Sequence, residues 1–222
     1  MKLKPAINQM LVPEEQKNYS GRVMALIKYV TIHTTGNYSP TATAEAHARF
    51  QFNGGSGKTS WHYTVDEKEI WQSFNDNQVC WHTGTDAGNQ CSIGIEICVN
   101  NPTHFILGCM NAAALTAYLL DKHSLTDKDI KQHYGWSGKN CPAELRGGHW
   151  GVNWQEFLKM VDDHLTHHQA PSPWAENAWA WATTHRILDG TGPQGHPTRE
   201  MLAQMLYNYH QYMAGNKYYS EP

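Results

Sequence analysis

The chain has 222 residues, of which 40% are hydrophobic and 17% charged, and its formal net charge at pH 7 is −3. This composition excludes an intrinsically disordered chain, and the small negative charge provides no basic surface for nucleic acid. The length predicts one large domain, or a catalytic domain followed by a small one. No uninterrupted apolar run approaches the roughly 20 residues that span a bilayer, so we expect no membrane insertion.

The N-terminal segment MKLKPAINQMLVPEEQKN lacks the continuous apolar stretch of a signal peptide. We therefore expect synthesis in the cytoplasm and release by another route. The five cysteines are an odd number, which argues against a disulfide framework and leaves thiols available for a metal. The 14 histidines suggest a metal as well, although each histidine taken alone is more often structural.

Taken in chain order, the patterning begins with a strand. Residues 28–34 (KYVTIHT) are rich in β-branched and aromatic side chains, and His33 shares a strand face with Tyr29 and Thr31. Residues 41–52 predict a helix that ends at the following glycines. Residues 60–66 and 69–74 predict a β-hairpin.

The strongest strand signal is residues 91–99 (CSIGIEICV), where isoleucines alternate with small residues and Glu96. The isoleucine face predicts packing under a helix, for which residues 111–123 are suited. Another helix is predicted after Asn153, which can cap it, with an apolar stripe formed by Trp154, Phe157, Leu158, Val161 and Leu165.

A domain boundary is predicted at residues 167–173 (HHQAPSP), which separate a domain at 1–166 from a small helical module at 174–222. In the module, one helix carries Trp174, Ala178 and Trp181 on one face, and Thr198 can cap the next. Two helices are too few for a stable core of their own. We therefore expect the module to dock on the first domain or to pair with a second copy as a homodimer.

Three residues offer a set of metal ligands: His33 late in the first strand, and His133 and Cys141 on either side of a polar loop. Two imidazoles and a thiolate suit Zn²⁺ and leave a fourth position open for water. The spacing is not that of a zinc finger. On spacing alone, the alternative is a hydrogen-bonded core histidine and a small buried cysteine.

Glu96 stands among small residues on its strand face, with isoleucines opposite. A carboxylate on a central strand is costly unless it has a partner. Two interpretations remain open at this point: a structural ion pair, or a base beside a metal-bound water. Lys139, two residues before Cys141, places a cation near the same loop.

Four segments, in the order of a known family, resemble the zinc-dependent N-acetylmuramoyl-L-alanine amidases: TIHTTGN, SWHYTVDEKEIWQ, WHTGTDAGNQCSIGIEICVN and HYGWSGKNCP. These enzymes cleave peptidoglycan in phage endolysins and bacterial autolysins, and they are related in fold to peptidoglycan recognition proteins. The resemblance covers roughly residues 25–165.

The resemblance implies an α/β fold in which helices flank a mixed central β-sheet, with zinc in a groove on one sheet face. It implies that His33, His133 and Cys141 bind the zinc, that Glu96 activates water, and that Lys139 helps to polarise the amide carbonyl. The candidate substrate contacts in the groove are Trp61, His62 and His82. Some relatives have a tyrosine where this chain has Trp61, which puts a phenol role in doubt. For His82, a structural hydrogen bond is an equal alternative.

The C-terminal segment resembles a single S-layer-homology-like unit found behind some endolysin catalytic domains, where such units are thought to bind the cell wall. Trp179 is the candidate for stacking on sugar rings, because Trp174 and Trp181 share a helix face that is more often core. A dimerisation or docking element without a ligand is the alternative.

The expected function is hydrolysis of the bond between N-acetylmuramic acid and the L-alanine of the stem peptide. The expected partner is bacterial peptidoglycan, reached after holin-mediated release. The alternatives are a peptidoglycan-binding module without catalysis and a zinc peptidase acting within the stem peptide. The sequence does not separate a phage endolysin from a bacterial autolysin.

Overall fold

The structure is a computed structural model that describes residues 4–166, 175–185, 187 and 199–214. It divides the chain into two units, Met1–Asp162 and Asp163–Pro222. The division lies inside helix α6 (Trp154–Thr166), close to the predicted end of the first domain at residue 166. The predicted linker, residues 167–173, lies outside the described residues.

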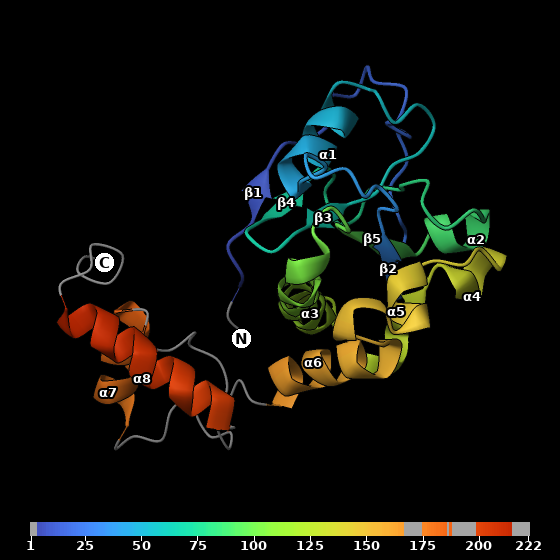
Figure 1. The fold of residues 1–222 in the computed structure, drawn as a ribbon. Helices are drawn as coiled ribbons and strands as arrows, with labels where there is room; N and C mark the ends of the chain where they lie inside the picture. The colour runs from blue at the N-terminus through green and yellow to red at the C-terminus, as the bar shows by residue number, and fades with distance from the viewer. Residues whose placement is uncertain (1–3, 167–174, 186, 188–198, 215–222) are drawn as a thin grey trace. The chain divides into compact units, whose positions relative to one another are not determined.

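The first unit contains a six-stranded mixed sheet of strand order β1-β4-β3-β5-β2-β6 (Figure 1). Its strands are β1 (Asn8–Gln9), β2 (Tyr29–Thr34), β3 (Tyr63–Val65), β4 (Ile70–Gln72), β5 (Ser92–Ile97) and β6 (Ile130–Gln132). The β3–β4 pair is antiparallel, which confirms the predicted hairpin, and the other neighbouring pairs are parallel.

The register between the two central strands positions the candidate site. In the parallel β2–β5 pair, His33 lies opposite Glu96 and Ile32 lies opposite Ile95. Because side chains alternate across a strand, His33 and Glu96 share one face of the sheet, and the isoleucines share the other. Ile93, Ile95 and Ile97 are fully buried, as their alternation predicts.

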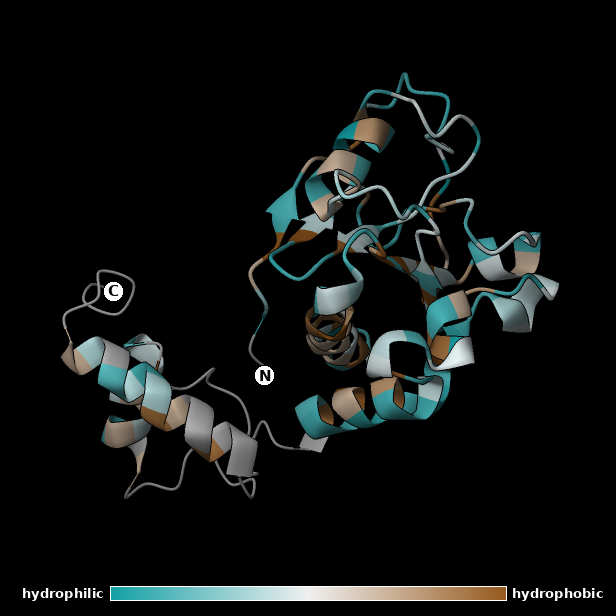
Figure 2. Cartoon of the chain, in the orientation of Figure 1, coloured by the Kyte–Doolittle hydropathy of each residue, from teal (hydrophilic) through white to brown (hydrophobic). Residues whose placement is uncertain are grey.

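The principal core helix is α3 (Phe105–Lys122), which contacts β5, β2 and β3. It begins six residues before the predicted start because Phe105, Gly108 and Cys109 are also buried and extend the apolar surface. Figure 2 colours this helix mostly as hydrophobic. Among the described residues, 102–122 form one helix long and apolar enough to cross a membrane, and 56% of its apolar stretch is buried inside the protein. Such burial is typical of the core helix of a globular domain.

The remaining helices of this unit are shorter or more amphipathic. Helix α1 (Ala44–Phe52) is capped by the Thr43 side chain and contacts β3 and β4. Helix α6 begins after Asn153, whose side chain accepts a hydrogen bond from the Glu156 backbone, as predicted, and its Phe157 and Val161 are fully buried. Three short helices were not predicted: α2 (Asp86–Asn89), α4 (Tyr134–Ser137) and α5 (Ala143–Gly147). Single 3₁₀ turns form at Pro102–His104, Asp127–Asp129 and His149–Gly151.

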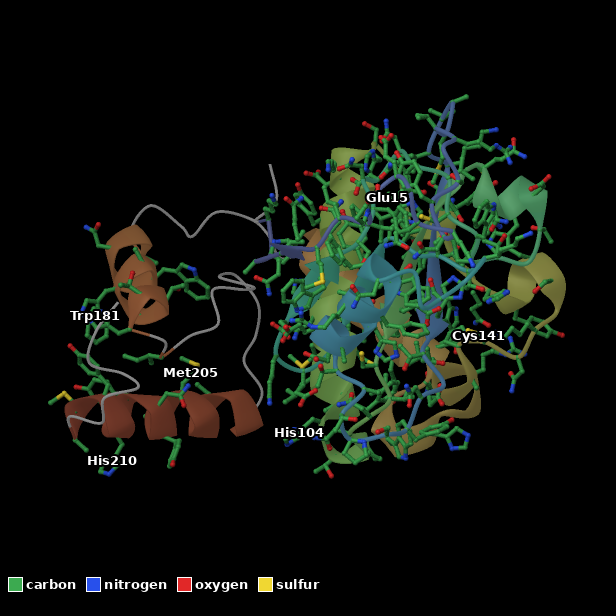
Figure 3. All side chains as sticks on the ribbon, turned by 90° about the horizontal axis from the view of Figure 1, so that it is seen from above. Glu15, His104, Cys141, Trp181, Met205 and His210 are labelled. Carbon is green, nitrogen blue, oxygen red and sulfur yellow. The ribbon has the colours of Figure 1, made fainter. Side chains whose placement is uncertain are left out.

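The second unit contains α7 (Glu176–Thr184) and α8 (Arg199–Met213), which match the two predicted helices. Trp181 of α7 packs edge-on against Tyr212 of α8, with ring centroids 5.6 Å apart. The prediction that Trp179 is the more exposed tryptophan is wrong: Trp181 (labelled in Figure 3) is 43% exposed and Trp179 is less so. The reason is that α8 covers only part of the Trp181 ring. Trp174 and the predicted cap Thr198 lie outside the described residues.

Candidate active site

The two histidines and the cysteine of the predicted ligand set converge at the ends of the central strands. His33 lies near the end of β2, His133 directly follows β6, and Cys141 (labelled in Figure 3) precedes α5. The Nδ1 atoms of the two histidines are 3.0 Å apart, and Cys141 Sγ is 3.7 Å from His33 Nδ1. The ligand atoms all lie within 4.8 Å of one another. The structure thus assembles the three-residue group that the sequence predicts.

The protonation of these residues suits a cation. Burial lowers the pKa of His33 and of His133, so each imidazole stays neutral and keeps a lone pair at neutral pH. Burial raises the pKa of the Cys141 thiol to about 12, and a bound divalent cation would reverse this by stabilising the thiolate. Neutral imidazoles and a thiolate are ligands of thiophilic transition metals. The residues therefore fit a metal of this kind.

Glu96 lies beside the group on β5. Its Oε1 is 3.9 Å from His33 Nδ1, and its Oε2 is buried without a hydrogen-bond partner among the described residues. Burial raises the pKa of Glu96 to about 8, against the opposing effect of the Lys139 charge. A buried carboxylate oxygen without a partner is unusual, and this one is available to bind a water or a substrate group.

Lys139 lies between the end of α4 and Cys141, and its side chain is exposed. Its positive charge contributes to the lowered pKa values of His33 and His133. The charge of Lys139 therefore acts on both ligand histidines while its side chain stays accessible to solvent.

The three candidate substrate contacts lie deeper than predicted. Trp61 is 7% exposed, and its indole N–H donates to Thr64 Oγ1 at 2.7 Å. His62 is fully buried, accepts the Gly94 N–H at 2.9 Å on Nδ1, and has Nε2 2.9 Å from the carbonyl oxygen of Gln78. His82 is also buried, and its Nδ1 atom lies 2.9 Å from the Nε2 atom of His33. This arrangement favours supporting roles, and contact with substrate stays a prediction.

The sequence reasoning missed two polar residues near the site. Asn89 is buried, and its Oδ1 accepts hydrogen bonds from the backbone N–H groups of His82 and Thr83, at 3.0 Å each. Glu144 is 3% exposed; its Oε1 accepts a hydrogen bond of 2.6 Å from the Tyr38 hydroxyl, and its Oε2 has no partner among the described residues. A polar residue soon after His82 or Cys141 is a weak signal, because loops are rich in such residues.

A cavity of about 420 Å³ lies elsewhere in the first unit. Its lining includes Asp76, whose buried carboxylate accepts hydrogen bonds from Lys122 at 2.7 Å and His123 at 2.8 Å. None of the ligand or carboxylate candidates lines it. The convergence of metal ligands, not the size of a cavity, therefore identifies the candidate site.

The fold and the site together define an α/β domain in which a mixed sheet presents a His-His-Cys metal group beside a buried carboxylate. Residues 23–144 match the model of the family described as N-acetylmuramoyl-L-alanine amidase, and the chain belongs to this family.

Two relatives carry the name of this family. The chain is 40% identical over 169 residues to N-acetylmuramoyl-L-alanine amidase XlyA of Bacillus subtilis, a match that covers 72% of this chain and 56% of that protein. It is 34% identical over 170 residues to N-acetylmuramoyl-L-alanine amidase CwlH of Bacillus subtilis, covering 75% of this chain and 65% of that protein. The chain thus spans less than two thirds of the length of either relative.

Solved structures of catalytic domains share the fold. The catalytic domain of XlyA superposes with a TM-score of 0.64 at 37% identity, over 70% of this chain and 99% of that chain. PlyL superposes with a TM-score of 0.62 at 27% identity, over 70% of this chain and 96% of that chain. The predicted α/β fold with a mixed central sheet is therefore confirmed.

Proposed function

We propose that this protein is a zinc-dependent N-acetylmuramoyl-L-alanine amidase that acts on bacterial peptidoglycan. The observation that carries the proposal is the buried convergence of His33, His133 and Cys141 beside Glu96, in a chain of this family. The substrate bond is the amide between the lactyl group of N-acetylmuramic acid and the L-alanine of the stem peptide.

The three ligands would hold one Zn²⁺ and leave a position open toward the substrate. When bound, zinc lowers the pKa of a coordinated water and polarises the scissile carbonyl. Three protein ligands with an open position are the pattern of catalytic zinc sites, whereas structural zinc sites have four protein ligands.

Glu96 is the general base and then the general acid. Its Oε2, which has no partner in the described part of the chain, takes a proton from the attacking water, whose oxygen forms the new bond to the carbonyl carbon. The same carboxyl group returns the proton to the nitrogen of L-alanine as the C–N bond breaks. A bound cation favours the carboxylate form of Glu96 and so offsets the effect of burial on its pKa.

Lys139 stabilises the negative charge that develops on the carbonyl oxygen. Its side chain is exposed between α4 and the ligand Cys141, which supports this role because it is accessible to a substrate. Electrostatic stabilisation of this kind is typically the largest single contribution to hydrolysis of an acyl bond.

For the C-terminal unit, we propose anchoring to the cell wall. The exposed ring of Trp181 and the partly buried ring of Trp179 offer flat apolar surfaces to sugars. Pairing of two copies through this unit stays a prediction. An endolysin that reaches the wall after release from the cytoplasm fits this arrangement, as does an autolysin.

The test is mass spectrometry of purified peptidoglycan digested by the zinc-loaded protein, with Glu96→Gln as the control. Free stem peptides that begin with L-alanine, together with intact glycan strands, would support the amidase. Shortened peptides still attached to muramic acid would identify a peptidase. No cleavage, with the protein sedimenting on the walls, would identify a binding module.

A further inference from the structure

A chain of hydrogen bonds runs from the β5 backbone to a metal ligand. The carbonyl oxygen of Ser92 lies 3.1 Å from His82 Nε2, and His82 Nδ1 lies 2.9 Å from His33 Nε2. All three residues are buried. Nothing in the proposed mechanism uses His82, although its ring contacts the central ligand with centroids 5.1 Å apart.

The Ser92 carbonyl group sets the order of donors and acceptors along this series of hydrogen bonds. A carbonyl oxygen only accepts, so His82 Nε2 carries the hydrogen. A neutral imidazole carries one N–H, so with that hydrogen on Nε2 the Nδ1 atom of His82 is an acceptor. His33 Nε2 must then be the donor, which leaves the lone pair on His33 Nδ1. That nitrogen is the one that faces His133 Nδ1 and Cys141 Sγ.

Thr83, which follows His82 in the sequence, contacts the second histidine ligand, His133. His133 has a hydrogen bond with the backbone of Thr83, and its Nε2 is close to Gly84, where a Cβ atom would lie 3.7 Å from it. The Asn89 side chain holds this segment in place by accepting the N–H groups of both His82 and Thr83. The consecutive residues His82 and Thr83 thus contact the two imidazoles of the metal group, one each.

We infer that His82 is a positioning residue that fixes the tautomer and orientation of His33, and that the Thr83 backbone does the same for His133, so that both ligands present Nδ1 to the metal. The inference rests on the metal site of the proposed function. Metal-bound histidines generally donate their other N–H to such a partner, and loss of the partner typically weakens metal affinity by about 10- to 100-fold.

The test compares zinc affinity, measured by competition with a chelator, in the full-length protein and two variants. In His82→Gln the amide can still donate to Ser92, but no acceptor remains at the position of Nδ1. In His82→Asn the amide oxygen takes that position and keeps the acceptor for His33. We expect His82→Gln to lose about 10- to 100-fold in zinc affinity and His82→Asn to retain most of it.

The matched control is His62→Gln, the same chemical change at an equally buried ring, whose hydrogen bonds go to Gln78 and Gly94 instead of His33. We expect it to leave the zinc affinity unchanged. Urea unfolding of the metal-free proteins checks that each variant folds. The absorption spectrum of bound Co²⁺ reports the ligand geometry directly, and we expect it to change in His82→Gln and not in His82→Asn.

Equal zinc affinity and the same cobalt spectrum in wild type and His82→Gln would overturn the inference and leave the proposed function standing. An equal loss in His82→Gln and His62→Gln would also overturn it, because a general packing effect would then explain both. If His82→Gln does not fold, His82→Asn decides, since a 10-fold or greater loss in that variant would contradict a tautomer role. A wild-type protein that binds no zinc would overturn the proposed function and the inference together.

Discussion

Replacing Gly94 with alanine would disturb His82 without altering any hydrogen-bonding group. Gly94 lies in β5 directly against the His82 ring: a Cβ atom would be 2.7 Å from Nδ1, 2.8 Å from Cγ and 3.0 Å from Cε1. Unbonded atoms of these kinds pack at about 3.5–4.0 Å. The ring must therefore move by roughly 0.5–1 Å, since the strand is held on both sides by β2 and β3.

The size of the effect follows from that displacement. The hydrogen bond between His33 Nε2 and His82 Nδ1 is 2.9 Å long, and a shift of this size stretches it toward about 3.5 Å or more, where little of it remains. Inserting a methyl group into a packed core typically costs about 1–3 kcal/mol of stability. Loss of the partner of a metal ligand weakens metal affinity by about 10- to 100-fold.

The assay measures two quantities for Gly94→Ala: the free energy of unfolding in urea without metal, and the zinc affinity of the folded protein. The control is Gly108→Ala in α3, where a Cβ atom would meet ordinary contacts at 3.6–3.7 Å. This control should be stabilised by up to about 1 kcal/mol, because alanine favours a helix, and should keep its zinc affinity. A Gly94→Ala protein that is destabilised yet binds zinc as tightly as the wild type would refute the reasoning.

Three further predictions concern other parts of the molecule. Glu96→Gln should retain zinc and lose about 10²- to 10⁴-fold in release of stem peptides; near-normal turnover would contradict the role of general base. Asp76 has its pKa lowered by hydrogen bonds from His123, Lys122 and Tyr63, which outweigh the effect of burial. The contribution of Asp76 to the free energy of unfolding is therefore present above the unfolded pKa of about 3.9. It is lost as the pH falls toward the lower pKa of the folded state. Asp76→Asn should cost about 1.5–3 kcal/mol at pH 7, and urea unfolding should show a smaller difference below pH ~3.9; a constant difference would argue against this linkage. Deleting residues 172–222 should weaken binding to intact walls more than hydrolysis of small soluble fragments, and an equal loss of both would mean that the segment stabilises the first unit.

The sequence predicted those elements in which buried apolar residues recur at the regular spacing of a strand or a helix. Alternating isoleucines identified β5, and the same alternation placed Glu96 on the face opposite to them. Strand β1 was missed because it has only two residues, and β6 (IKQ) because it has a single buried apolar residue, whereas β3 and β4 lie within longer alternating segments. The early start of α3 was missed because its first turns are apolar on most sides, which hides the helical period.

The sequence predicted the metal ligands of the candidate site, but not the buried residues that hold those ligands in place. The chemistry of His33, His133 and Cys141 suggested a ligand set whose spacing is only a weak signal, and resemblance to a family made the prediction specific. Alternation can say which face of a strand a side chain takes, but not how deep the neighbouring loops bury it. For this reason the sequence did not show that His62 and His82 are buried, and their contact with substrate stays a prediction.

The position of β2 between β5 and β6 bears on how this protein is made. His33 and His133 are 100 residues apart, and Cys141 follows β6. A growing chain therefore synthesises its first ligand early, yet the other two emerge only when most of the domain has been translated. The proposed metal site therefore cannot be complete until both later ligands have been made, unlike the site of a small zinc finger, which folds as it binds its metal. On the proposed function, the site exists only once β6 and the segment that carries Cys141 have joined β2.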